Sequence, residues 1–395
     1  LVPKVVLLGA SGRHNFGDML MPHIAIELMV RCGIARNSFI VSDIAPRDLT
    51  MYDGHNVKGI FDVLASKDSL GGIVVAGGEV SGCTFRCAMP MFFHLEEEDA
   101  HAAQVHAAAQ AAYQSKYLYQ GRADWIAYMP AKSYLPSNLQ STKLIANTIG
   151  APAGWSPNLV DYSFASFRNG PGGGHELAPD SVILIRRLMD DKISPLDLRL
   201  QVAGPYIAVQ FKSSLFVENR ALFLDGVCDS LGEMARELSA GVVFFRAGAA
   251  HDHDSLANYR LMQASITAKF SDVRTRVFEE LKIFKITALI SKAKALVSTS
   301  LHTRIIATAY HVRRLTLHPS RKHMGWIDNW DPLKTSSMIH DFVDDWRGQW
   351  RRMNVPDATL DTSAIEEMYY ASYKRYAHVL GVVTCPVDLA SAPRW

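Results

Sequence analysis

The sequence of 395 residues contains no apolar run that reaches the roughly 20 residues needed to span a bilayer. Its 5 cysteines are few, odd in number and scattered, which is typical of reduced thiols in a cytosol-like compartment. An excess of one charge sign is also missing, since 41 basic and 39 acidic residues give a net charge of +2. This balance gives no bulk electrostatic reason to expect a nucleic-acid partner. These absences favour a cytoplasmic globular protein, and residues 1–8 are expected to form a strand rather than a signal peptide.

Residues that could bind a metal are present but poorly spaced. Cys83 and Cys87 would supply two ligands, but no second Cys/His pair has zinc-like spacing. The tract from His251 to Asp254 alternates His and Asp, yet adjacent loop residues cannot all face one ion. We therefore expect no metal, and we interpret this tract as a loop that caps the following helix.

Short apolar runs alternate with longer amphipathic ones, which is the pattern of an α/β protein with parallel sheets. We expect strands at 5–8, 39–41, 72–76, 125–129, 206–211, 242–245, 295–299 and 315–317. We expect helices at 18–32, 96–119, 220–239, 259–269, 278–294, 337–352 and 363–379. Residues 150–175 are rich in Gly, Pro, Asn and Ser, which favours a flexible linker over a mobile lid. The pattern predicts two Rossmann-like domains, at 1–200 and 201–340, followed by C-terminal helices at 341–395.

The most informative stretch follows the apolar strand at 295–297. It runs through small hydroxyl residues to His302 and Arg304, and a helix-like segment begins at once. Open α/β sheets build their sites where a strand ends in a polar turn before a helix. Helix-start amides, an imidazole and a guanidinium together favour an anion. The alternative for Arg304 is an ion pair with an acidic residue of its own helix.

Two glycine-rich turns follow strands of the first half. Residues 9–18 carry glycines too widely spaced for a dinucleotide fingerprint, with Asn15 and Asp18 at the helix start. The alternatives are that Asp18 only caps the helix and that Asn15 is only a turn residue. The strand at 73–76 likewise leads into Gly77, Gly78 and Glu79, where Glu79 is either a site carboxylate or a solvated one.

Cations follow three of the predicted strands of the second half. Lys212 follows 206–211, Arg246 follows 242–245, and Lys322 comes after 315–317. In a parallel sheet these strand ends share one edge, so the three cations are predicted to converge near His302. Such a cluster suits a small polyanion, whereas each cation singly could be a surface residue.

Three separated motifs together resemble the polysaccharide pyruvyltransferase family. They are Asn15-x-Gly17-Asp18, then Val75-Ala76-Gly77-Gly78-Glu79, and then Ser298-x-Ser300-Leu301-His302-x-x-Ile305-x-Ala307. The resemblance extends from about residue 5 to residue 330. It implies a GT-B-like pair of Rossmann-type domains, a site in the cleft between them, and C-terminal helices that pack back on the first domain. It also implies transfer of a pyruvyl group from phosphoenolpyruvate to two hydroxyls of a sugar, in polysaccharide biosynthesis and without a further cofactor.

The resemblance also implies residue roles. His302 would transfer the proton, because histidine donates and accepts protons near neutral pH, or it would bind the leaving phosphate. The donor-binding residues would be Arg304, Lys212, Arg246, Ser300 and Lys322. The acceptor-binding residues would be Asn15, Asp18, Gly77, Gly78 and Glu79.

The sequence departs from the family at Ser300, where the resemblance places an arginine, and at Lys212, where it also places an arginine. We expect Arg304 or another cation to supply the missing charge. A GT-B glycosyltransferase that uses a nucleotide-sugar, and a non-catalytic sugar-binding protein of the same fold, remain as alternatives. The tryptophans and arginines of 346–352 favour a helix that docks its aromatic side chains on the protein, and they leave open contact with a membrane surface. A homo-oligomer is equally open.

Overall fold

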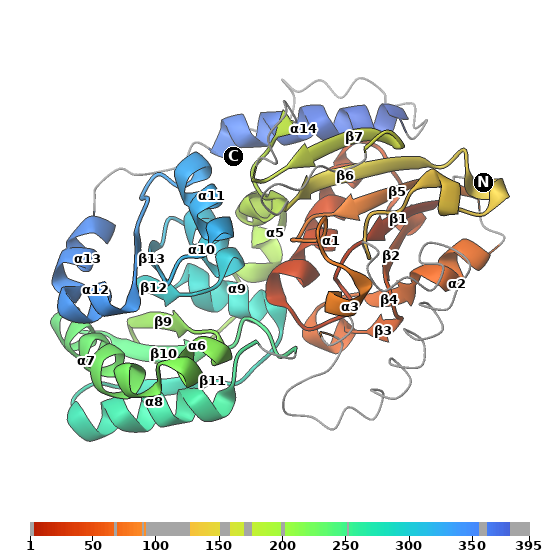
Figure 1. Ribbon diagram of the computed structural model, residues 1–395. Coiled ribbons are helices and arrows are strands. Elements are labelled where there is room, and N and C mark those ends of the chain that lie inside the picture. The colour runs from red at the N-terminus through yellow and green to blue at the C-terminus, as the bar shows by residue number, and fades with distance from the viewer. Residues whose placement is uncertain are drawn as a thin grey trace.

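The computed structural model describes residues 4–66, 69–88, 91, 127–150, 159–169, 176–198, 202–250, 253–354 and 362–379. Two sheets with flanking helices confirm the predicted two-domain α/β architecture, and Figure 1 shows one sheet in each half of the molecule. We call the unit built on the first sheet the first domain, and the unit built on the second sheet the second domain. No helix of the described residues is both long and apolar enough to cross a membrane.

The first sheet has the strand order β3-β4-β2-β1-β5-β6-β7-β8. Its strands are β1 (Lys4–Leu8), β2 (Phe39–Asp43), β3 (Arg47–Asp48), β4 (Asn56–Gly59), β5 (Leu70–Ala76), β6 (Lys143–Ile149), β7 (Tyr162–Phe167) and β8 (Glu176–Leu177). All neighbours pair in parallel except β3 and β4. The chain adds strands on one side of β1 and then, from β5, on the other. The turns that follow β1 and β5 therefore open at a topological switch point.

The helices of the first domain are α1 (Phe16–Arg31), α2 (Ile60–Ala65), α3 (Phe85–Ala88) and α5 (Ile185–Ile193). Short 3-10 turns lie between them, namely η1 (Arg36–Ser38), η2 (Thr50–Tyr52), η4 (Lys132–Tyr134), η5 (Ser137–Leu139) and η6 (Ser181–Leu184). Twelve of the 16 residues of α1 are buried, because it packs against β5, η6, α14 and the second-domain helices α9 and α10. An apolar helix without a polar face is what such a central position requires.

The second sheet has the order β11-β10-β9-β12-β13-β14, and all its strands pair in parallel. Its strands are β9 (Tyr206–Gln210), β10 (Gly241–Phe245), β11 (Thr275–Phe278), β12 (Ala295–Ser298), β13 (Arg313–Leu317) and β14 (Ser336–Ser337). Its helices are α6 (Ser213–Glu218), the π-helical turn η7 (Leu222–Val227), α7 (Cys228–Glu237), α8 (Leu256–Lys269), α9 (Ile283–Ser291), α10 (Leu301–Ala309) and α11 (Arg321–Trp330). This strand order is that of the Rossmann fold, whose ligands bind where the order reverses, here between β9 and β12.

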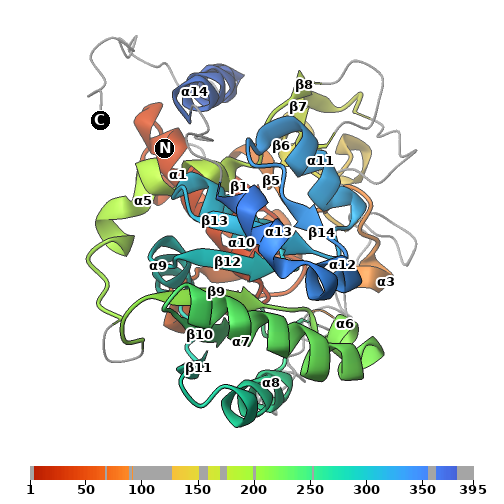
Figure 2. The ribbon, with the colours of Figure 1, turned by 90° about the vertical axis from the view of Figure 1, so that its left-hand side faces the viewer.

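The C-terminal helices divide between the domains. Helices α12 (Ile339–Asp344) and α13 (Trp346–Met353) pack on the second domain, where Trp346 is buried and donates to Glu233 at 2.9 Å. Helix α14 (Thr362–Val379) packs on α1 and η6, and Asn147 Nδ2 donates to the hydroxyl of Tyr373 at 2.6 Å. Figure 2 shows α14 well apart from α12 and α13. Of the C-terminal helices expected to pack back on the first domain, α14 does so, whereas α12 and α13 do not. Trp346 packs on the protein, as expected.

Several predicted elements were wrong. Residues 127–129 of the expected strand form a turn, and β7 lies inside the stretch expected to be a linker. The expected helix at 278–294 begins as β11, because Phe278 pairs with Phe245 of β10, and only 283–291 are helical. The predicted helix at 96–119, the glycine run at 170–174 and His251 with Asp252 lie outside the described residues.

Candidate functional site

A cavity of about 300 Å³ lies between the two domains, where the turns of both switch points meet. Its first-domain lining is Arg13, Asn15, Asp18, Glu79, Cys83, Cys87, Met91 and Arg168. Its second-domain lining is Gln210, Lys212, Ala247, His253, Asp254, Thr299, Ser300, Leu301, His302 and Lys322. Seven residues predicted for the site, from both domains, thus line one interdomain cleft: Asn15, Asp18, Glu79, Lys212, Ser300, His302 and Lys322.

The turn after β1 fixes the two domains to each other on one side of this cleft. Asn15 forms a β-bridge with Gly248, and the amide of Phe16 donates to the carbonyl of Ala247 at 2.8 Å. The carbonyl of His14 accepts the amide of Ala249 at 3.0 Å, and its ring nitrogen Nε2 lies 2.7 Å from the carbonyl of Leu281. Burial lowers the pKa of His14 to about 4, so this contact is made by a neutral ring. These bonds set the width of the cleft beside the predicted site.

Asn15 and Asp18 both reach the cavity, but not in the roles that the capping alternative gave them. Asn15 occupies the N-cap position of α1 without a side-chain capping bond, and Asp18 lies inside the first turn. The Asp18 carboxylate pairs with Arg13 at 3.2 Å, and both side chains are nearly buried. Although burial opposes it, the charge of Asp18 and its neighbours raises the pKa of Arg13. The interpretation of Asp18 as a helix cap was wrong.

Gly17 explains why the turn after β1 and the start of α10 meet. A Cβ at Gly17 would lie 1.9 Å from Nδ1 and 2.0 Å from Cγ of His302. Because real side-chain atoms do not approach that closely, the imidazole of the second domain packs flat against the bare Cα of the first. Gly17 is thus required by His302, and the two halves of the predicted site are in direct contact.

His302 is held by a carboxylate that the sequence did not predict. Its Nε2 lies 3.4 Å from Oδ2 of Asp180, which is completely buried at the N-cap of η6. At this distance the pair is a charge contact rather than a well-formed hydrogen bond, and Nε2 has no hydrogen-bond partner among the described residues. Burial by itself would raise the pKa of Asp180, but His302 and Arg168 outweigh it and lower that pKa to about 2. Nε2 is therefore turned to Asp180, while Nδ1 is the ring atom nearest to Gly17.

Four cations surround the cavity. Arg13 and Arg168 are 9% and 4% exposed, whereas Lys212 and Lys322 lie nearer the solvent. Lys322 reaches across the cleft to Glu79 of the first domain at 3.4 Å. The neighbouring His253 is affected by these positive charges. Burial first, and then the charges of Arg13, Lys322 and Lys212, lower the pKa of His253 to about 4.

The start of α10 adds backbone donors to these charges. Ser300 occupies the N-cap position without a side-chain capping bond, and Thr299, Ser300 and Leu301 all line the cavity. A helix of nine residues that begins here turns unpaired N–H groups and the positive end of its dipole toward the cleft. The arrangement is suited to a phosphate or carboxylate.

Four of the predicted binding residues, namely Arg304, Arg246, Gly77 and Gly78, are absent from the lining of the cavity. Arg304 is completely buried, and it donates from Nε to Asp331 at 2.7 Å and from Nη1 to Thr316 at 2.9 Å. Burial lowers the pKa of Arg304 to about 10 in spite of Asp331. The ion-pair partner of Arg304 is Asp331, which follows α11 and does not belong to α10. The prediction that Arg304 binds the donor was wrong, because it lies two residues after His302 and therefore on another face of α10.

Arg246, Gly77 and Gly78 are likewise absent from the lining of the cavity. Arg246 turns back to the carbonyl of Glu279 at 3.5 Å, while the next residue, Ala247, faces the cleft. Gly77 has a φ of 63°, and a Cβ there would lie 2.4 Å from the sulfur of Met21. Gly77 is therefore needed for the turn and for packing on α1. Gly78, with a φ of 79°, places its Cα beside Asp18, since a Cβ there would lie 3.2 Å from Oδ1.

Sequence reasoning missed Arg13, Arg168, Asp180 and Asp254. Arg168 follows β7, which lay in the predicted linker, and Asp180 precedes a 3-10 turn without strand periodicity. Asp254 is 1% exposed and accepts the Ala247 amide at 2.6 Å and Gln210 Nε2 at 2.7 Å. Burial raises the pKa of Asp254 to about 7. The residue that caps α8 is Ser255, so the interpretation of Asp254 as part of a helix cap was wrong.

Cys83 and Cys87 line the cavity, but the described part of the chain holds no group of three His, Cys, Asp or Glu residues that could bind a metal. Burial raises the pKa of Cys83 to about 11, which keeps it a neutral thiol at neutral pH. A thiol in that state is neither a ready metal ligand nor a ready nucleophile.

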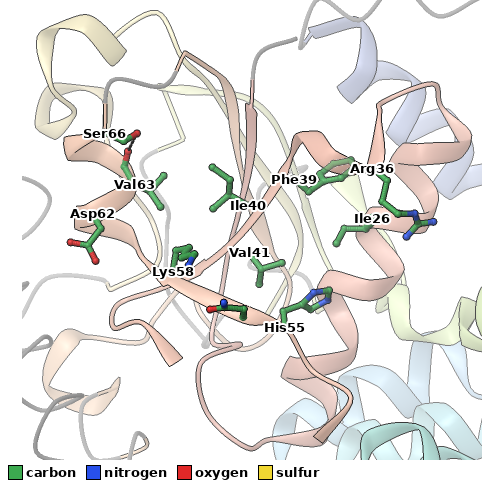
Figure 3. A pocket seen from close by; sticks show the side chains of 11 residues that line it. Ile26, Arg36, Phe39, Ile40, Val41, His55, Lys58, Asp62, Val63 and Ser66 are labelled. Carbon is green, nitrogen blue, oxygen red and sulfur yellow. Dashed lines mark hydrogen bonds between the residues drawn. The ribbon is translucent and has the colours of Figure 1, made fainter. Parts of the chain in front are cut away.

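A second cavity, of about 540 Å³, lies within the first domain and contains none of the predicted residues. Figure 3 shows the side chains around it, which come from α1, β2, β4, α2 and their connections. It opens because β2 and β4 pair only at Ser42–Lys58 and Asp43–Gly59, so their other ends diverge. Its walls are largely apolar, with Arg36 turned to Glu27, and it lacks the converging cations of the interdomain cleft.

No protein-family model and no curated protein matches the sequence. Solved structures are similar over nearly the whole chain. The UDP-GlcNAc 2-epimerase of Methanocaldococcus jannaschii aligns with a TM-score of 0.56 at 9% identity, covering 96% of this chain and 99% of its own. The Neisseria meningitidis UDP-GlcNAc 2-epimerase bound to UDP-GlcNAc aligns with a TM-score of 0.52 at 10% identity, covering 94% and 100%. At such identities the likeness shows the fold alone, and the chain has the two-domain GT-B fold.

Proposed function

We propose that this chain transfers a pyruvyl group from phosphoenolpyruvate to two hydroxyls of a sugar, with the interdomain cleft as its active site. The observation that carries the proposal is one compact cavity where four cations and the start of α10 surround a carboxylate-held histidine. Because one fold serves many chemistries, the residues of the site, and not the fold, support this reaction.

The donor fits the cleft in size and charge. A cavity of about 300 Å³ lies at the lower end of the range of ligand pockets, roughly 300–1,000 Å³. Phosphoenolpyruvate is small and carries both a phosphate and a carboxylate. Arg13 and Arg168 offer planar donors suited to such groups, and Lys212 and Lys322 offer mobile charges.

The chemistry requires a proton donor that later becomes a proton acceptor. In the proposed reaction the methylene carbon of the donor gains a proton, and a sugar hydroxyl attacks the resulting oxocarbenium-like carbon. The C–O bond to phosphate breaks and a neighbouring hydroxyl closes the ketal; of the two hydroxyl protons, one returns to the general base and the other leaves with the phosphate. His302 supplies the first proton and takes one back, while Asp180 stabilises the protonated imidazole. The cations of the cleft stabilise the departing phosphate.

The acceptor would be held from the first domain. Asn15 offers a side-chain amide that makes no capping bond, and Asp18 and Glu79 are carboxylates that contact Arg13 and Lys322. Amide and carboxylate groups are the usual partners of sugar hydroxyls. Because the first domain supplies these groups opposite His302, the acceptor would approach the donor across the cleft.

A second candidate is a GT-B enzyme that uses a nucleotide-sugar. The similar structures support it more directly than the first candidate, since they are enzymes named for UDP-GlcNAc and one of them contains it. The site favours it less, because no Phe, Tyr or Trp is among the described residues that line the cleft to stack on a base. The cations and helix start would serve a diphosphate equally well.

Turnover separates the candidates. The full chain is incubated with phosphoenolpyruvate and a panel of glycans, and in parallel with UDP-GlcNAc and other nucleotide-sugars. We expect phosphate release and a glycan that has gained a pyruvyl ketal by mass, with His302→Gln as the inactive control. Consumption of a nucleotide-sugar without any use of phosphoenolpyruvate would establish the second candidate instead. An absence of both turnover and phosphoenolpyruvate binding would refute the first.

A further inference from the structure

Arg168 is a buried cation that keeps a donor without a hydrogen-bond partner among the described residues. It follows β7 in the first domain, is 4% exposed and lines the interdomain cavity. Its Nη1 donates to Asp180 Oδ2 at 2.8 Å, and its Nε is buried with no hydrogen-bond partner among the described residues. A guanidinium has five N–H donors, and leaving buried donors unpaired is unfavourable.

The charges around Arg168 leave room for an anion. Asp180 is shared between Arg168 and His302, so one carboxylate faces two cationic groups once His302 is protonated. Arg13, on the same side of the cavity, also has Nε and Nη1 buried without hydrogen-bond partners in the described part of the chain. An ion pair serving the fold alone would have its donors satisfied, as those of Arg314 are by Asp331 and Val312.

The position of Arg168 also relates it to the reacting group. Asp180 contacts both Arg168 and His302, and both of these side chains line the same cavity. The start of α10, where Ser300 and Leu301 line the cavity, faces the same space from the second domain. A phosphoryl group placed there would bring an arginine, helix-start amides and His302 together.

We propose that Arg168 binds the phosphoryl group of the donor from the first domain, while the start of α10 and Lys212 bind it from the second. This inference rests on the proposed function insofar as the donor is a small phosphorylated acid. The donor site would then be formed by residues of both domains rather than by the second domain alone. Arg168 would also supply the positive charge that the resemblance places at position 300, where this chain has Ser300.

The test compares Arg168→Met and Arg168→Lys with the wild-type chain by calorimetric titration, using inorganic phosphate and phosphoenolpyruvate as probes. Arg314→Met is the matched control, since Arg314 is also buried and paired with an aspartate but does not line the cavity. Thermal unfolding identifies the variants that fold. We expect Arg168→Met to weaken both probes by about 10- to 100-fold, the loss typical of a charged hydrogen bond. Arg168→Lys, which keeps the charge, should lose less, and a folded Arg314→Met should bind normally.

The outcomes separate this inference from the proposed function. If the wild-type chain binds phosphate and Arg168→Met loses it, the phosphoryl site stands even where phosphoenolpyruvate proves not to be the donor. If a folded Arg168→Met or Arg168→Lys binds inorganic phosphate as tightly as the wild type, the inference is overturned. A loss confined to phosphoenolpyruvate would also overturn it, because Arg168 would then contact the carboxylate rather than the phosphate.

Discussion

Replacing Gly17 with alanine tests the contact on which the site depends. The added Cβ would lie 1.9 Å from Nδ1 of His302, whereas ordinary contact begins near 3.4 Å, so the ring must retreat by about 1.5 Å. Misplacement of a catalytic group by roughly 1 Å can cost about 100-fold in rate. The packing strain should cost about 1–3 kcal/mol of unfolding free energy, which a chain of this size can absorb. We therefore expect Gly17→Ala to fold and to lose about 100-fold in turnover.

The assay is phosphate release at saturating phosphoenolpyruvate and acceptor, with thermal unfolding as the measure of fold. Gly325→Ala is the control, because it lies in α11 and its Cβ would come no closer than 3.2 Å to Asn169. We expect this control to keep its activity. A folded Gly17→Ala that retains full turnover would show that the placement of His302 against the first domain does not matter for catalysis.

Further expectations follow from the ion pairs. Asp180→Asn should lower turnover by about 100-fold or more while phosphoenolpyruvate still binds, because His302 loses the carboxylate that stabilises its protonated form. Unchanged turnover would show that Asp180 does not support His302 in catalysis. The pKa of Asp180 is lowered to about 2, so its stabilising contribution is complete above pH 4 and is lost as the pH falls toward 2. The acid unfolding of the wild type and of Asp180→Asn should therefore differ above pH 4 and converge as the pH falls toward 2. Arg304→Met leaves Asp331 with Arg314 alone and should reduce the unfolding free energy by about 3–5 kcal/mol, yet a folded sample should keep its affinity for phosphoenolpyruvate, measured by titration. Lys322→Gln should change stability by less than about 1 kcal/mol in urea unfolding, since its pair with Glu79 is exposed on both sides.

The structure brings predicted residues together in one cleft where the prediction depended on strand ends. Lys212 follows β9 and Ser300 follows β12, the two strands between which the order reverses, and the amide of Lys212 donates to Thr299 Oγ1 at 2.9 Å. Asn15 and Glu79 follow β1 and β5, which hold the same relation in the first sheet. Parallel sheets bring the carboxyl ends of these strands together irrespective of the helices that connect them. The predicted strands alone were therefore enough to place these residues in one cleft.

The predictions failed where side-chain direction decided the outcome. Arg304 lies two residues after His302 on one helix, so its side chain leaves α10 on another face. Arg246 precedes Ala247, which lines the cleft, but Arg246 itself bonds to the carbonyl of Glu279. Arg168 and Asp180 were missed for another reason. They come together through an ion pair in the folded chain, across a segment whose glycines and prolines concealed β7. No local pattern in the sequence encodes that pairing.

The cleft is proposed to bind a small phosphorylated acid, and titration of the wild-type chain with phosphoenolpyruvate and with UDP-GlcNAc tests this proposal. We predict saturable binding of phosphoenolpyruvate that Arg168→Met weakens, and weaker binding of UDP-GlcNAc, because the described lining of the cleft offers cations but no aromatic side chain for a base. Tight binding of UDP-GlcNAc together with no binding of phosphoenolpyruvate would contradict the claim.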